Sequence, residues 1–350
     1  MRPLRLSWLW GSAQAGSSLT LASTAWMVSG FTPSPLLNSL LPALGTLPVL
    51  LPLRRRPSGY GLQLASVLLL LGVSVAQLSG RVAPPWLLVP SLLAVLLFGI
   101  GAEESQLPLQ RRLLRQSGLS IERLRQGSDL GALAGNLLTA VLFPAVKQFT
   151  PALLLLLPLG SAALPAADRS ATDAPEAAPE ASEAPPPLER RCLLQGLLFG
   201  GLFALLPLWV RAVGAGKCFD FAMVLAAYGV GRSLQGRLPA LPGAMRYGLM
   251  GGLLIGTQVT PGWAAVLLFV PLGALAAAAD GALVEQLAPL GDGALRWQVL
   301  QRSGAVGGLA GSLGMGLFAQ LLGLGMAVPL QVAAFAAMAL LAGRPPRAAT

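Results

Sequence analysis

The sequence predicts an all-α integral membrane protein with about 12 transmembrane helices, arranged as two parallel six-helix halves. Three observations carry this prediction. Of the 350 residues, 54% are hydrophobic and 11% are charged, with a mean hydropathy of +0.68, which is too apolar for a soluble domain. Apolar runs of membrane-spanning length recur along the chain, and a segment of the first half is repeated in the second.

An acidic segment near the middle of the chain separates the two halves. Prolines, alanines and carboxylates leave it little apolar surface to bury, so we expect an extended or disordered tether rather than a binding site. The predicted parts are an N-terminal six-helix half (1–167), a cytoplasmic acidic Pro/Ala linker (168–191), a C-terminal six-helix half (192–343) and a short cytoplasmic tail (344–350).

Six apolar runs on each side of the linker are long enough to cross a bilayer as helices. In chain order they cover residues 7–30, 35–53, 60–79, 85–103, 127–147, 150–167, 192–213, 218–236, 245–260, 262–286, 298–323 and 326–343. We interpret the first run as an uncleaved helix, because its apolar and small residues continue to Val28. A signal peptide cleaved near Ala15 is the alternative.

The distribution of basic residues tests this count. With twelve spans and both termini inside, all but four of the 24 Lys and Arg residues fall in inside segments, as expected for loops on the cytoplasmic side. The four exceptions are Arg81, Lys147, Arg211 and Lys217. We therefore expect a multi-pass protein of a bacterial plasma (inner) membrane, with both termini cytoplasmic.

An internal repeat supports the division into halves. A shift of 176 positions aligns residues 131–135 (GALAG) with 307–311 (GGLAG), and it aligns Glu104 with Asp280. Spans four and five thus recur as spans ten and eleven. Because the shift crosses six spans, an even number, the two halves have the same orientation.

Several functional classes are disfavoured. The chain has no histidine and two cysteines, Cys192 and Cys218, so we expect no metal site and no cofactor. The basic residues form short clusters between apolar runs, not the solvated face that nucleic-acid binding requires. Residues 214–218 (GAGKC) lack both the first glycine and the Ser/Thr of a phosphate loop, so an ATPase is rejected. No enzyme is expected.

Two local stretches resemble known sequences. Residues 25–28 (AWMV), followed by 34–36 (SPL), are similar to the junction of the first two helices in the exporter-like branch of the major facilitator superfamily, which includes enterobactin and macrolide exporters. Residues 107–135 resemble that branch's basic loop leading into a Gly-rich fifth helix. The resemblance implies the major facilitator fold and secondary transport.

The family's motifs are degenerate here. Members usually carry the loop G-x-x-x-D-R-x-G-R-R between helices two and three, and its Asp helps to latch the cytoplasmic gate. Residues 51–56 read LPLRRR, which keeps the basic cluster without the Asp. The G-P pair that is common in the fifth helix of exporters is also absent, since Gly131 is followed by Ala132.

Charged residues near span ends are candidates for a gate or for coupling: Glu104, Asp280, Asp129, Arg111 and Arg112. Glu104 and Asp280 occupy equivalent repeat positions, and intramembrane carboxylates are costly enough to suggest a function. They either pair with arginines of the adjoining loops or carry a coupling proton. The expected arginine partners are Arg111, Arg112, Arg115 and Arg296. Asp129 is expected to cap the fifth helix, where the helix dipole favours a negative charge.

Polar residues within apolar spans are candidates for a cavity or substrate site: Gln14, Ser17, Ser18, Tyr228 and Arg232. Packing of small residues is the alternative for the two serines. Arg232 either faces a central cavity, where it would attract an anion, or marks the cytoplasmic end of its helix.

Four glycines at repeated positions are expected to allow close packing of helices: Gly131, Gly135, Gly307 and Gly311.

The functional prediction is a secondary transporter that moves a small organic solute by alternating access, with efflux as the expected direction. The alternative is a transport-incompetent relative that serves as a membrane scaffold or assembly factor. Expected partners are the lipid bilayer, an unknown small-molecule substrate and a proton as candidate coupling ion. No nucleic acid is expected, and the protein is predicted to be a monomer.

Overall fold

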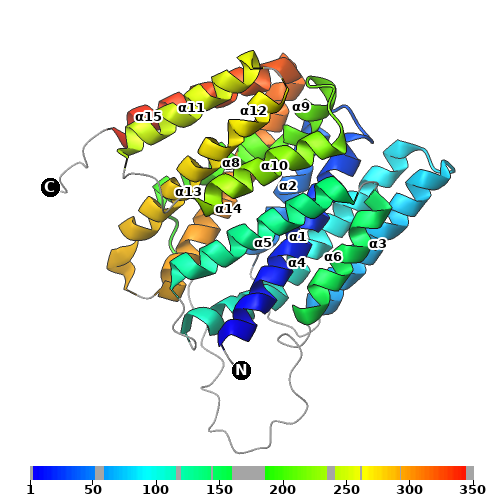
Figure 1. Ribbon diagram of the computed structural model, residues 1–350, viewed down its shortest axis with the longest axis horizontal. Helices are drawn as coiled ribbons and strands as arrows, with labels where there is room; N and C mark the ends of the chain where they lie inside the picture. The colour runs from blue at the N-terminus through cyan, green and yellow to red at the C-terminus, as the bar shows by residue number, and fades with distance from the viewer. Residues whose placement is uncertain are drawn as a thin grey trace, which may run out of the picture.

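In the residues that the structure describes, the chain passes twelve times between two faces of a helical bundle (Figure 1). The computed structural model describes residues 3–51, 59–115, 120–142, 145–159, 186–234, 241–260, 262–291 and 293–343, and all regular elements in these ranges are helices. The predicted all-α class is thereby confirmed.

The first six passes are α1 (Pro3–Ser29), α2 (Pro35–Thr46) with the 3-10 helix η1 (Leu47–Leu50), α3 (Gly59–Ser79), α4 (Pro84–Arg115), α5 (Ile121–Val141), and α6 (Ala145–Leu156) with η2 (Leu157–Leu159). The second six are α8 (Arg190–Ala204) with α9 (Leu206–Ala212), α10 (Cys218–Ser233), α11 (Gly243–Val259), α12 (Trp263–Leu267) with α13 (Phe269–Gln286), α14 (Gly293–Leu322) and α15 (Ala327–Ala342). Short 3-10 helices, η4 (Ala288–Leu290) and η5 (Leu324–Met326), flank α14.

Two passes of the second half are interrupted. α8 and α9 are separated at Leu205, and α12 and α13 are separated at Leu268. A proline follows each break within three residues, Pro207 in the first case and Pro271 in the second. Proline has no N–H and its ring clashes with the preceding turn, so a helix cannot continue through it without losing a hydrogen bond.

Six of the passes contain segments long and apolar enough to cross a membrane on their own. They are Gly59–Ser79, Pro84–Gln106, Arg190–Ala212, Trp263–Gln286, Leu295–Leu322 and Leu324–Ala342. The other six passes are shorter or less apolar. Several of these pack closely on other helices, α1 on α5 and α5 on α10, so protein covers much of their surface in place of lipid.

All odd-numbered passes run in one direction and all even-numbered passes in the other. α1 therefore begins, and α15 ends, on the same side of the bundle (Figure 1). We call this side the termini face and the other side the opposite face.

Each half has its own apolar core. In the first half, buried residues of α1, α3, α4 and α6 surround Leu70 and Phe149, which are inaccessible to solvent. In the second half, α8, α10, α11, α13 and α15 surround Leu272 and Phe335. Trp26 of α1 belongs to the second core, so this core extends across the contact between the halves.

The four predicted packing glycines lie where two helix pairs approach closely. A Cβ at Gly131 or Gly135 would meet the carbonyl oxygen of Gly11 or Ala15 in α1, and a Cβ at Gly307 or Gly311 would overlap that of Leu193 or Leu197 in α8. Leu193 and Leu197 follow Gly11 and Ala15 by 182 residues, so the α1–α5 contact of the first half recurs as the α8–α14 contact of the second.

The predicted limits of spans five and six are wrong. The sequence placed them at 127–147 and 150–167, whereas α5 covers Ile121–Val141 and α6 begins at Ala145. The predicted boundary fell just before Pro151, but the structure keeps this proline inside α6, as the seventh residue of the helix, at the cost of one backbone hydrogen bond.

Most of the predicted linker and the whole predicted tail lie outside the described residues. The described end of the linker includes Glu189, whose carboxylate accepts a hydrogen bond from the backbone N–H of Cys192 and caps α8. The proposed domain limits remain predictions.

Replacing Gly307 by Ala should destabilise the fold by about 1–3 kcal/mol, because the new Cβ overlaps the Leu193 carbonyl. Gly314→Ala is the matched control: it lies on the same helix, and a Cβ there meets nothing within 4 Å. Since alanine favours helix over glycine, this control should be neutral or slightly stabilising. Thermal unfolding in detergent compares the two variants, and equal melting temperatures would contradict the close contact.

Candidate functional site

The two halves meet along a contact that we call the seam, formed mainly by α5 against α10 and by α2 against α14. Small residues shape both contacts. A Cβ at Gly229 would lie 3.3 Å from Cβ of Leu133, and a Cβ at Gly316 would overlap the hydroxyl group of Ser39. Side chains at the ends of these helices can therefore reach across the seam.

Arg232 of α10 forms an ion-paired cluster with two aspartates near the termini face. Its Nε donates to Oδ1 of Asp129 in α5 at 2.6 Å, and its Nη2 donates to Oδ2 of Asp280 in α13 at 2.8 Å. The three side chains are only 19%, 10% and 21% exposed. Asp129 belongs to the first half and the other two residues to the second, so one of the two ion pairs crosses the seam.

Close packing of α10 on α13 brings Arg232 to Asp280. A Cβ at Gly231 would overlap the carbonyl oxygen of Val270, and a Cβ at Gly273 would overlap that of Tyr228. Larger residues at these two glycines would push the helices apart, so the glycines set the reach of the arginine.

A second layer of polar groups supports Asp280. Gln195 of α8 donates through Nε2 to Oδ1 of Asp280 and accepts at Oε1 from the Tyr247 hydroxyl of α11 at 2.7 Å. Both carboxylate oxygens of Asp280 are thus occupied. Burial of a charge is tolerable only when such partners compensate it.

Arg125 lies beside this cluster on α5, one helical turn before Asp129. Its side chain is buried, with 6% relative exposure, and its Nε has no hydrogen-bond partner. The guanidinium faces α13, where a Cβ on Gly281 would lie 3.5 Å from Nη1 and 3.6 Å from Nη2. It is close enough to interact electrostatically with Asp280, Arg232 and Asp129.

The structure corrects two expectations for the carboxylates. Asp129 does not cap α5, because this helix begins at Ile121 and its cap is Ser120, which accepts from the N–H of Arg123. Asp280 pairs with Arg232, whereas Arg296 donates to the backbone oxygen of Gly291.

Glu104 lies in α4 beside the start of α3, where a Cβ at Gly59 would overlap its side chain. Its Oε2 is buried without a hydrogen-bond partner. Glu104 is thus separate from the cluster that contains its repeat equivalent. Arg111 and Arg112 are in α4, but their side chains lie outside the described part of the chain.

The predicted polar residues of α1, Gln14, Ser17 and Ser18, form hydrogen bonds with other helices of the first half. Gln14 donates to Gln106 at 3.0 Å, and Gln106 donates to Ser17 at 3.1 Å. Ser18 donates to Asn136 at 2.8 Å. Gln14, Ser17 and Ser18 keep partial exposure, so they combine inter-helix bonding with some accessible surface.

Tyr228 lies one turn before Arg232 and packs its ring edge-on against Phe203, with centroids 4.9 Å apart. The guanidinium carbon of Arg232 is 5.9 Å from the centre of the Tyr228 ring. Arg232 also stands one residue before the end of α10. It therefore marks a helix end and makes a specific contact as well.

A different contact crosses the seam at the opposite face. Arg211 of α9 donates to the Ser29 hydroxyl at 3.0 Å and to the backbone oxygen of Trp26 at 2.9 Å, and its guanidinium carbon lies 4.0 Å from the Trp26 ring centre. Trp26 in turn stacks on Phe221 of α10 at 5.8 Å. All the groups that bind Arg211 here are uncharged.

Trp297, near the start of α14, adds an apolar contact at the termini face. It is 9% exposed and packs in a cluster whose other buried members all come from the first half. These members are Leu9, Trp10, Ala13, Tyr60, Leu109, Leu113, Leu124 and Leu159.

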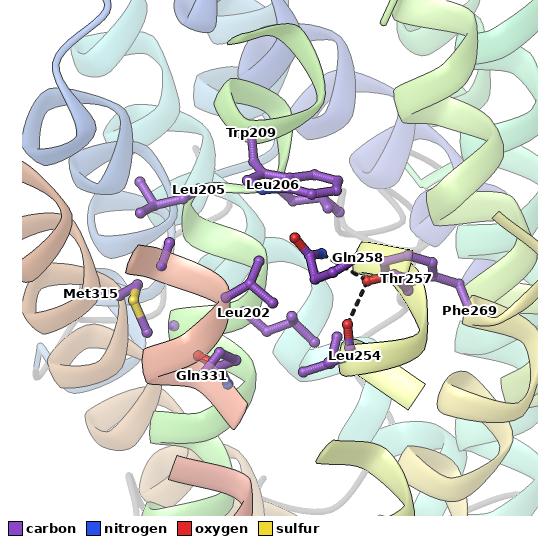
Figure 2. Close-up of a pocket in the computed structure, with 13 residues that line it drawn as sticks. Leu202, Leu205, Leu206, Trp209, Leu254, Thr257, Gln258, Phe269, Met315 and Gln331 are labelled. Atoms are coloured by element: carbon purple, nitrogen blue, oxygen red, sulfur yellow. Dashed lines mark hydrogen bonds between the residues drawn. The ribbon is translucent and has the colours of Figure 1, made fainter. Parts of the chain in front are cut away.

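A pocket of about 450 Å³, including its open mouth, lies within the second half (Figure 2). Its wall is mostly apolar and includes Leu205 at the break between α8 and α9. Its polar residues are Thr257, Gln258 and Gln331, which donate to Leu254, Thr257 and Leu198 respectively. None of the predicted cavity residues lines this pocket.

The site has no metal-like geometry: within the described residues, His, Cys, Asp and Glu do not form a group of three that could hold an ion. The seam therefore joins the halves by contacts of two kinds. Arg232 has charged partners at the termini face, and Arg211 has uncharged partners at the opposite face.

Three residues of the cluster were not predicted as site residues. Gln195 and Tyr247 are polar positions inside apolar runs, and this signal was available in the sequence. Arg125 was assigned to a basic loop because the fifth span was predicted to begin at residue 127.

Solved structures share this fold, although no family model matches the sequence and no curated protein matches it. The nucleoside transporter NupG aligns over 98% of this chain and 98% of its own, with a TM-score of 0.58 and 12% identity. An occupied, inward-facing bacterial homolog of the human lysosomal transporter Spinster covers 97% of this chain and 92% of its own, with a TM-score of 0.58 and 14% identity. The fold is therefore of the major facilitator type, with two six-helix halves.

Replacing Arg232 by Gln should cost about 3–5 kcal/mol of unfolding free energy, because the buried carboxylate of Asp129 and the partly buried carboxylate of Asp280 lose their cation. Adding Asp129→Asn should recover part of this loss, since one of the uncompensated charges is removed. Lys217→Gln, at an exposed cation of the opposite face, is the control and should change little. Chemical unfolding in micelles measures all of these variants, and strictly additive losses would contradict the coupling.

Proposed function

We propose that this protein is a secondary transporter that moves a small organic solute across the membrane by alternating access. The observation that carries the proposal is the pair of polar contacts that join the halves at opposite ends of the seam, Arg232–Asp129 and Arg211–Ser29. The similarity of fold to solved transporters supports it. In this mechanism, each contact breaks while the other holds, so that a central site opens to one side at a time.

The chemistry of the two contacts suits repeated opening. A hydrogen bond to a charged group contributes only about 1.5–3 kcal/mol, because water replaces the lost partner when the contact opens. Both contacts are formed in this structure, and Trp297 adds apolar packing at the termini face. With both contacts formed, the proposal assigns this structure to a state closed at both ends.

Orientation, direction and coupling belong to the proposal. The distribution of arginines supports a bacterial plasma membrane with the termini face in the cytoplasm. The exporter-like motifs support efflux, and the proposed state of the protein is a monomer. A proton is the candidate coupling ion, and Glu104 is its candidate carrier, since Oε2 is buried without a hydrogen bond.

Opening can be followed with single cysteines at the seam, after Cys192 and Cys218, which are buried, are replaced by Ala. Gly281→Cys reports on the termini face, where it faces Arg125, and Ala25→Cys reports on the side of Trp26. Asp129→Asn should raise labelling of Gly281→Cys several-fold and lower that of Ala25→Cys. Arg211→Gln should have the reverse effect.

Proteoliposomes complete the test, with uridine and ethidium as an uncharged and a cationic probe. Flux of either probe that is lost in Arg232→Gln supports transport. If neither gate variant changes labelling at either face, and neither probe moves, alternating access is rejected and the scaffold function takes its place.

A further inference from the structure

The cluster at the termini face contains one arginine more than its ion pairs use. The first half contributes Arg125 and Asp129, and the second half contributes Arg232 and Asp280, so each half carries one cation and one anion. In the closed structure Arg232 binds both aspartates. Arg125 is buried beside them, and it has no ion pair among the described residues.

This arrangement has a cost in the closed state. A buried guanidinium whose Nε has no hydrogen bond keeps much of its desolvation penalty, which the attraction of nearby carboxylates offsets only in part. Arg125 lies against Gly281, the residue after Asp280, so its position is set by the second half as well as by its own helix. Its burial therefore depends on the halves being together.

Opening the termini face separates Asp129 from Arg232. Where water replaces the lost cation only in part, a carboxylate left in such a site is destabilising, and this opposes opening. Arg125, however, is four residues before Asp129 on α5, and side chains at this spacing lie on the same helix face within reach of each other. Arg232 keeps Asp280, which lies in its own half.

We propose that opening of the termini face exchanges ion pairs: Asp129 passes from Arg232 to Arg125, and each half moves away with a neutral pair of its own. The proposal rests on the proposed function, since it assigns Arg125 a role in one of its two gates. Arg125 thus acts as a positioning residue for Asp129 in the open state.

The exchange predicts a specific dependence between two substitutions. Arg125→Gln should lower the ratio of open to closed molecules at least fivefold, because Asp129 then has no partner in the open state. Asp129→Asn should raise this ratio. In the Asp129→Asn background, Arg125→Gln should lower the ratio much less, because no carboxylate remains for Arg125 to bind in the open state and only its burial cost in the closed state is relieved.

Double electron–electron resonance in nanodiscs, with spin labels on Gln126→Cys and Glu285→Cys, gives the ratio of open to closed molecules from the distance distribution between the labels. Both positions are exposed, one on α5 and one at the end of α13, and Cys192 and Cys218 are replaced by Ala. Arg123→Gln, at an exposed arginine of the same helix, is the control and should leave the ratio unchanged. Arg125→Lys should retain most of the open population. Arg125→Met keeps the apolar stem and should act like Arg125→Gln, so it replaces that variant if Gln does not fold.

An equal effect of Arg125→Gln with and without the Asp129 carboxylate would overturn the exchange, as would the absence of any effect. If Asp129→Asn and Arg232→Gln also leave the distance unchanged, the gate itself is rejected, and the proposed function fails with it. If Asp129→Asn raises the ratio of open to closed molecules but Arg125→Gln leaves it unchanged, the ion-pair exchange is wrong and the proposed function stands.

Discussion

The neutralisation of Arg232 is the constraint on which much of this structure depends. A guanidinium that is 19% exposed must find carboxylates, and two reach it from different helices. Glycines at positions 231 and 273 let α10 approach α13 closely enough for one pair, and the seam between α5 and α10 supplies the other. Gln195 then donates to the remaining carboxylate oxygen, and Tyr247 donates to Gln195. The presence of these two polar residues in otherwise apolar spans is thus explained by one cation.

The bundle separates permanent contacts from breakable ones by the kind of atoms that touch. Within each half, glycines at 135 and 311 bring backbone against backbone, and such contacts change only if a helix moves as a whole. Across the α5–α10 contact, a side chain packs on backbone instead, as Leu133 does on Gly229. In the proposed mechanism, halves built in this way rotate as rigid bodies while the contacts between them exchange.

The fold could be predicted from the sequence because apolar runs are local, and because the repeat at a spacing of 176 residues can be found by aligning the sequence with itself. The partners of Arg232 could not, since they lie 103 and 48 residues away. The repeat gave no help: the shift that relates Glu104 to Asp280 places Ala305 at the position equivalent to Asp129. The predicted cap at Asp129 was wrong because α5 begins six residues earlier than its apolar run. For the same reason Arg125 was assigned to a loop and not to the helix.

The two ends of the seam differ in a way that bears on the order of opening. Arg211 is held by a hydroxyl, a backbone carbonyl and an aromatic face, all uncharged, so water can replace these partners without leaving an unpaired anion. Opening the termini face separates an arginine from a carboxylate and also uncovers Trp297. Apolar packing favours closure at both faces, through Trp297 at one and through Trp26 against Phe221 at the other, so the ion pair is what makes opening of the termini face the costlier step. In the proposed mechanism, the pairing of Asp129 with a second arginine makes this opening accessible.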